Sequence, residues 1–140
     1  MELCRAEEIH TSAEAAILMD ADTGEVLYEK NADRRMLIAS TTKIMTVLLA
    51  IESGWSFDTQ VVVPPEAADI PDDSSTVPVY PGEVTSFGDL LYGLMLRSGN
   101  DAAVALAIYC GGTVEGFAEL MNDKARSLQM YNSRFVNPNG

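Results

Sequence analysis

Five of the six prolines in this 140-residue chain fall between residues 64 and 81. Proline lacks a backbone N–H and its ring clashes with the preceding helical turn, so a regular helix cannot run through this stretch. The stretch is also acidic and rich in serine, and the β-branched run Val61-Val62-Val63 precedes it. We therefore predict extended loops with short strands from Gln60 to Gly82.

Residues 15–30 carry the pattern of a β-hairpin. A short apolar run is followed by the turn residues Asp22-Thr23-Gly24, and residues 25–30 then alternate polar and apolar side chains. A hairpin alone is marginally stable in water, so its apolar face predicts further strands. Because the chain offers too few strands for a broad sheet, we expect these strands to lie beyond residue 140 or to come from another chain.

The most apolar predicted helix covers about residues 41–53, and Gly54 provides its stop. Its apolar face is formed by residues at helical spacing, namely Ile44, Met45, Val47, Leu48, Leu49 and Ile51. We expect this helix to be central and buried.

Three further helices are predicted as a cluster over about residues 86–130. Ser86 and Asp89 have the Ser-x-x-acid spacing of a helix N-terminus, and Thr113 is a candidate cap for the last helix. The middle helix follows Ser98-Gly99-Asn100, and its many small residues allow close packing. With about 100 to 150 residues per ordinary domain, the length predicts one domain or part of one.

The composition excludes several classes of function. The net charge is −12, and the clustered basic side chains that a phosphate backbone requires are absent, so we expect no nucleic-acid partner. No stretch approaches the roughly 18 apolar residues of a membrane span, and the N-terminus lacks a basic region followed by an apolar one. We therefore expect neither a signal peptide nor a membrane anchor within these residues.

The first chemical motif is Ser40-Thr41-Thr42-Lys43, at the start of the most apolar helix. Helical spacing puts the serine and the lysine on one face, one turn apart. A serine becomes a nucleophile when an adjacent base takes its proton, and a lysine desolvated beside an apolar helix loses its own proton more readily. The helix N-terminus would favour negative charge that develops beside Ser40. The alternative is that Ser40 simply caps the helix.

The second motif, Ser98-Gly99-Asn100, lies in a tight turn between two predicted helices. It places a hydroxyl and a carboxamide where both could face a site. The alternative is a loop in which Ser98 or Asn100 caps the next helix.

Together these two motifs resemble those of the D-alanyl-D-alanine carboxypeptidases among the penicillin-binding proteins. The resemblance rests on Ile38 to Thr46 and Ser98 to Ala103, and it extends to the hairpin, to Leu90-Leu91-Tyr92-Gly93 and to residues 135–140. It implies an α/β (α+β) fold of the β-lactamase/transpeptidase-like class, in which helices flank an antiparallel sheet. Residues 1–140 would form the N-terminal portion of a single catalytic domain whose later strands are missing here.

The resemblance also implies a role for each motif residue. Ser40 would be acylated by the penultimate D-alanine carbonyl of a peptidoglycan stem peptide, and Lys43 would accept its proton. Ser98 would relay a proton to the leaving amine, while Asn100 would bind the substrate amide and orient Lys43. β-Lactams would acylate Ser40 and persist as esters. Neither a metal nor a cofactor is implied, and the enzyme would act outside the bacterial cytoplasm, at the cell wall.

The third motif of that family, Lys-Thr-Gly on a later strand, is absent. In the family it supplies an oxyanion-hole N–H and a cation for the substrate carboxylate, so we expect little turnover from this chain alone. A complementary C-terminal segment is therefore an expected partner. The alternatives are a serine β-lactamase, which more often carries Asp at the position of Gly99, a DD-endopeptidase with the same machinery, and a non-catalytic module or split half.

Overall fold

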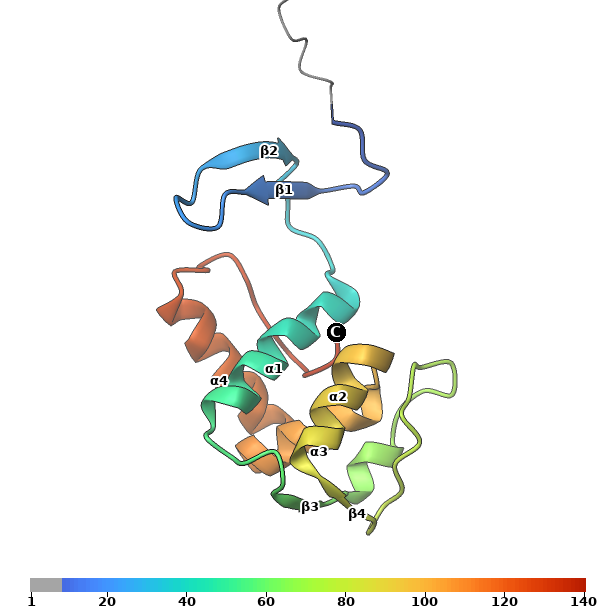
Figure 1. The fold of residues 1–140 in the computed structure, drawn as a ribbon. Coiled ribbons are helices and arrows are strands. Elements are labelled where there is room, and N and C mark those ends of the chain that lie inside the picture. The colour runs from blue at the N-terminus through green and yellow to red at the C-terminus, as the bar shows by residue number, and fades with distance from the viewer. Residues whose placement is uncertain (1–8) are drawn as a thin grey trace, which may run out of the picture. The chain divides into compact units, whose positions relative to one another are not determined.

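The computed structural model describes residues 9–140 and divides the chain into two compact units that meet between Met36 and Leu37. The first unit contains the hairpin of β1 (Ala16–Met19) and β2 (Val26–Lys30), which pair antiparallel with an irregularity between Leu18 and Met19 (Figure 1). The expectation of a single domain over residues 1–140 stays a prediction.

The hairpin leaves large apolar side chains exposed on both of its faces. Leu18 and Leu27 are 49% and 56% exposed, and Ile17, Met19 and Val26 are similarly open. Neighbouring residues of a strand point to opposite faces, so neither face of the hairpin is a polar surface. This pattern fits the expectation that further strands belong beside it.

The second unit begins with η1 (Ala39–Thr42) and ends with the long helix α4. Its other elements are α1 (Lys43–Glu52), β3 (Gln60–Val62), η2 (Pro65–Ala68), β4 (Val84–Ser86), α2 (Phe87–Arg97), α3 (Asn100–Gly111) and α4 (Val114–Ser127). The short strands β3 and β4 pair antiparallel on either side of the proline-rich stretch. Within residues 9–140 no single helix is long and apolar enough to span a membrane. Helices α3 and α4 reach that length and composition only when they are taken together, and the chain bends by 80° between them.

Two helix starts expected from the sequence are made by side-chain caps. The hydroxyl of Ser86 accepts a hydrogen bond from the backbone N–H of Asp89 at 3.0 Å and donates one to the Asp89 carboxylate at 2.7 Å. Thr113 accepts one from the N–H of Gly116 at 2.9 Å. Each cap satisfies an N–H that has no partner inside its helix.

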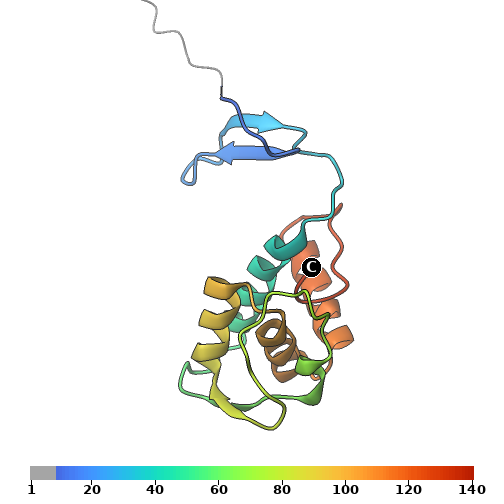
Figure 2. The ribbon, with the colours of Figure 1, turned by 90° about the vertical axis from the view of Figure 1, so that its right-hand side faces the viewer.

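Helix α3 lies at the centre of the second unit, with α1, α2, α4 and η2 packed around it (Figure 2). Residues 101–107 of α3 are all buried, and four of these seven residues are alanine. The small alanine side chains let the neighbouring helices approach α3 closely. Larger side chains fill the space around it, namely Phe87, Leu90, Leu94, Phe117, Met121 and Phe135.

The buried face of α1 differs from the expected one at Ile44 and Ile51. The helix begins at Lys43 because η1 forms the turn before it, and Ile44 and Ile51 are 65% and 57% exposed. Lys43 and Thr46 are buried instead, beside Met45. Four of the six expected residues do face the core, namely Met45, Val47, Leu48 and Leu49. Apolar spacing could not predict the burial of Lys43 and Thr46, because that burial depends on hydrogen-bond partners that lie far away in the sequence.

Replacing Ser86 with alanine should lower the free energy of unfolding by about 1 kcal/mol, because the Asp89 N–H loses its acceptor. Urea denaturation followed by circular dichroism measures this change. Ser133→Ala is the matched control: Ser133 is exposed, its hydroxyl makes no hydrogen bond within residues 9–140, and its loss should cost under about 0.5 kcal/mol. Equal losses in the two variants would contradict the capping role of Ser86.

Candidate active site

Lys43 is the first residue of α1 and is 3% exposed. Its Nζ lies 3.2 Å from Ser40 Oγ, 2.7 Å from Asn100 Oδ1 and 3.3 Å from the carbonyl oxygen of Asn139. An ammonium group has three N–H donors, so these three contacts satisfy it completely. Full satisfaction is required here, because a buried charge without hydrogen-bond partners is very costly.

Burial also changes the ionisation of this lysine. Desolvation lowers the pKa of Lys43 from its ordinary value of 10.5. No carboxylate within residues 9–140 lies close enough to Nζ to form an ion pair that would oppose this change. An ammonium can only donate to Ser40, whereas a neutral amine can accept the Ser40 proton. The lowered pKa therefore favours the form of Lys43 that can act as a base.

Ser40 lies in η1 and is an exposed residue. The alternative role as a helix cap is not found, because neither η1 nor α1 has a side-chain cap. Ala39, immediately before Ser40, has a left-handed backbone with φ of 45°. Such strain in a residue other than glycine is held by the surrounding structure and is typical of functional sites.

Asn100 begins α3, and its side chain reaches Lys43 instead of capping its own helix. The N-cap of α3 is Gly99, and no side chain caps the helix. Ser98 ends α2 in a left-handed conformation with φ of 57°, and its hydroxyl makes no hydrogen bond within residues 9–140. The structure thus brings Ser40, Lys43 and Asn100 together, while the role of Ser98 stays a prediction.

The turn that carries Asn100 is bound to the proline-rich stretch. The N–H of Asn100 donates to the carbonyl of Ser75 at 2.8 Å, and the buried carboxylate of Asp101 accepts from the N–H of Val77 at 2.9 Å. A Cβ atom at Gly99 would collide with a Val77 methyl group and lie 2.9 Å from the Asp101 carboxylate. The backbone of Gly99 is ordinary, with φ of −61°, so lack of space is what requires glycine here.

Two contributors to the site were not foreseen from the sequence. The first is the backbone carbonyl of Asn139, which accepts from Lys43. The second is Thr46, which is fully buried and donates to the carbonyl of Pro138 at 2.6 Å. A backbone acceptor has no sequence signature. For Thr46 the only signal in the sequence was a polar residue one turn after Lys43. Within residues 9–140, no cluster of three or more His, Cys, Asp or Glu side chains could hold a metal ion.

Comparison with known proteins adds an independent finding. Residues 3–140 match the model of a peptidase family described as D-alanyl-D-alanine carboxypeptidase. The chain is 39% identical over 140 residues to the D-alanyl-D-alanine carboxypeptidase DacF of Bacillus subtilis, covering 97% of this chain and 36% of that protein. It is 35% identical over 127 residues to a D-alanyl-D-alanine endopeptidase of Pseudomonas aeruginosa, covering 90% of this chain and 40% of that one.

The solved structures agree with the sequence matches. Penicillin-binding protein 5 of Haemophilus influenzae superimposes with a TM-score of 0.87 at 31% identity, over 96% of this chain and 41% of that chain. The match supports the expected α/β class with small antiparallel sheets and packed helices. The chain thus spans between about a third and two fifths of the length of these three proteins.

Gly99→Ala should lower the free energy of unfolding by about 1–3 kcal/mol, because the new methyl group overpacks the contact with Val77. In a Val77→Ala background the same substitution should cost less, since the opposing methyl group is gone. Urea denaturation of both single variants and the double variant measures this coupling. Strictly additive losses would show that Val77 is not what excludes a side chain at position 99.

Proposed function

This chain belongs to the D-alanyl-D-alanine carboxypeptidase family, and we propose that it carries the nucleophile and the base of an enzyme that removes the terminal D-alanine from peptidoglycan stem peptides. The observation that carries the proposal is the buried Lys43 amine, held between Ser40 Oγ and Asn100 Oδ1. A serine beside a desolvated lysine is an arrangement suited to acyl transfer.

In the proposed acylation, neutral Lys43 takes the proton of Ser40 while Ser40 Oγ bonds to the carbonyl carbon of the penultimate D-alanine. The C–N bond of the tetrahedral intermediate then breaks, and the terminal D-alanine leaves with a proton on its amine. That proton is the one Lys43 took from Ser40, and we assign its relay from Lys43 to the amine to Ser98, from its position two residues before Asn100. The product is an ester on Ser40. Water then attacks the ester carbonyl while Lys43 accepts a proton from the water, the bond between the acyl carbon and Ser40 Oγ breaks, and Lys43 returns the proton to Oγ.

Asn100 has two functions in this scheme. Its Oδ1 accepts from Lys43, which keeps the amine pointed at Ser40. Its Nδ2 makes no hydrogen bond within residues 9–140, so it is free to donate to the substrate amide. The same geometry would acylate Ser40 with a β-lactam, whose leaving group stays tethered to the ester. Because peptidoglycan lies outside the cytoplasmic membrane, the proposal places the enzyme there.

Two alternatives differ in how well they are supported. The endopeptidase of P. aeruginosa has a similar sequence, so cleavage of peptide cross-links by the same serine is a second candidate function. A β-lactamase is less favoured, because residues 3–140 match the carboxypeptidase family and Gly99 stands where β-lactamases more often carry Asp.

Benzylpenicillin provides the direct test of the nucleophile. We expect intact-mass spectrometry to show a penicilloyl adduct on the wild-type protein and none on Ser40→Ala. Ser133→Ala, which removes an exposed hydroxyl away from the site, is the control and should be labelled normally. An adduct on Ser40→Ala would exclude Ser40. Rapid loss of the wild-type adduct would favour the β-lactamase alternative, and slow loss a penicillin-binding protein.

We expect the 140-residue chain alone to release D-alanine from a stem-peptide substrate far more slowly than a full-length relative. The Lys-Thr-Gly motif is absent from these residues, and loss of a single oxyanion donor reduces turnover by on the order of 10²–10³. The comparison uses the B. subtilis carboxypeptidase as reference, with circular dichroism to show that the chain is folded. Release at the reference rate would contradict the need for a complementary segment.

A further inference from the structure

Residues 135–140, here called the C-terminal strap, return from the end of α4 to the start of α1 (Figure 1). The strap begins at Phe135, whose side chain is buried in the core, and Pro138 is also fully buried. Its far end lies against the residue before the nucleophile, because a Cβ atom at Gly140 would collide with the Ala39 carbonyl. The strap therefore runs from the core to the site.

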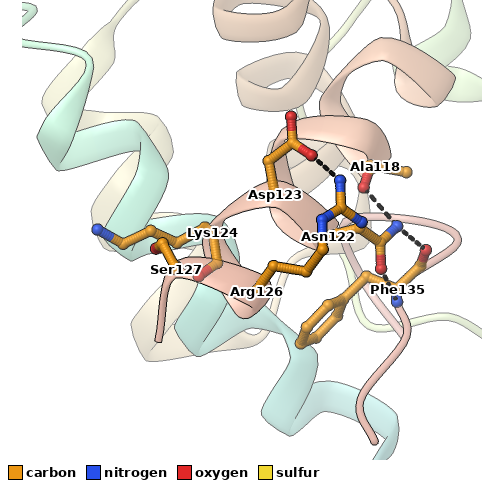
Figure 3. A network of polar contacts seen from close by, with 7 residues as sticks. All are labelled: Ala118, Asn122, Asp123, Lys124, Arg126, Ser127 and Phe135. Atoms are coloured by element: carbon orange, nitrogen blue, oxygen red, sulfur yellow. Dashed lines mark hydrogen bonds and ion pairs between the residues drawn. The ribbon is translucent and has the colours of Figure 1, made fainter. Parts of the chain in front are cut away.

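The first anchor of the strap is Asn122 on α4 (Figure 3). Its Nδ2 donates to the carbonyl of Phe135 at 2.8 Å, and its Oδ1 accepts from the N–H of Phe135 at the same distance. A further bond from Nδ2 to the carbonyl of Ala118, also at 2.8 Å, holds the carboxamide on its own helix. This two-way pairing fixes both the position and the direction of the backbone at Phe135.

Two more anchors lie closer to Lys43. Thr46, one turn after Lys43 on the same helix, donates to the carbonyl of Pro138 at 2.6 Å. The side chain of Asn137 accepts from the N–H of Gly140 at 2.6 Å, and Lys43 donates to the carbonyl of Asn139. That N–H and that carbonyl belong to one peptide unit, so Asn137 sets the orientation of the acceptor that Lys43 uses.

We propose that Asn122, Thr46 and Asn137 are positioning residues that hold the strap so that the carbonyl of Asn139 keeps the Lys43 amine between Ser40 and Asn100. This inference rests on the proposed role of Lys43 as the base. Without the strap the amine would lose one of its three acceptors and part of its cover from water. Its aim at Ser40 and its ionisation would then both change.

Few charged groups face Lys43 to complicate this effect. The strap carries no titratable side chain, and the first turn of α1 carries no acidic residue. On α3 the neighbouring charge is Asp101, whose carboxylate is bound by the N–H groups of Val77 and Ala102. Arg97 ends α2 and is exposed. The ionisation of Lys43 therefore depends mainly on burial, which the strap helps to provide.

The test uses Thr46→Val, which keeps the shape of the side chain but removes the hydroxyl, and Asn122→Ala. We expect each variant to form the penicilloyl adduct about tenfold more slowly at neutral pH, since a positioned proton acceptor contributes 10²–10⁴ in rate and only part of it is lost. The rate should recover as the pH rises toward 10.5, because a loosened strap admits water and raises the pKa of Lys43.

Matched variants separate positioning from stability. Thr46→Ser keeps the hydroxyl and should restore the wild-type rate. Arg126→Ala removes the exposed ion pair with Asp123 on α4 without touching the strap, and should also behave as wild type (Figure 3). Wild-type rates and pH profiles in folded Thr46→Val and Asn122→Ala would overturn the inference. So would an equal loss of rate at every pH.

A second measurement does not depend on catalysis. The titration of the Lys43 side chain, followed by NMR in the protein without β-lactam, should shift to higher pH in Thr46→Val and Asn122→Ala. If the wild type forms no adduct, the proposed function fails, but this titration still decides the role of the strap. A shift in both variants supports the role, and unchanged titration in both overturns it.

Discussion

The second unit is organised around the buried amine of Lys43, whose protonated form has three N–H donors. Lys43 needs three hydrogen-bond acceptors, and they come from residues 3, 57 and 96 positions away in the sequence. Satisfying this single group therefore ties together the turn before α1, the start of α3 and the C-terminal strap. A buried charge left without a partner is strongly destabilising, so none of these segments can move away alone. Stability and chemistry depend on the same contacts here.

The packing around α3 makes this convergence possible. Residues 101–107 of this helix are all buried and mostly alanine, and the helix begins with Asn100, whose side chain contacts Lys43 on α1. A methyl group of Val77 occupies the space that a side chain at Gly99 would need, and the carboxylate of Asp101 accepts a hydrogen bond from the N–H of Val77. The proline-rich stretch, which has little regular structure of its own, thus holds the turn that carries Asn100.

Interactions between residues close in sequence were predictable, and those between distant segments mostly were not. A spacing of three residues determines which side chains meet within a helical turn. It therefore predicted both the cap of Ser86 on Asp89 and the contact between Ser40 and Lys43. The convergence of Asn100 was expected only through resemblance to a family. The exposure of Ile44 was not predicted, because helical periodicity identifies the apolar residues on a helix but not which of them face the core. The carbonyl of Asn139 was missed because every residue has one.

The long separation between Lys43 and Asn139 has a consequence for the order of protein synthesis. At about 5–20 residues per second, the ribosome needs roughly 5–20 s to make the 96 residues between the lysine and its last acceptor. Throughout that time the contact between Lys43 Nζ and the Asn139 carbonyl cannot form. The three hydrogen bonds of this side chain can therefore be completed only after the far end of the segment has been translated.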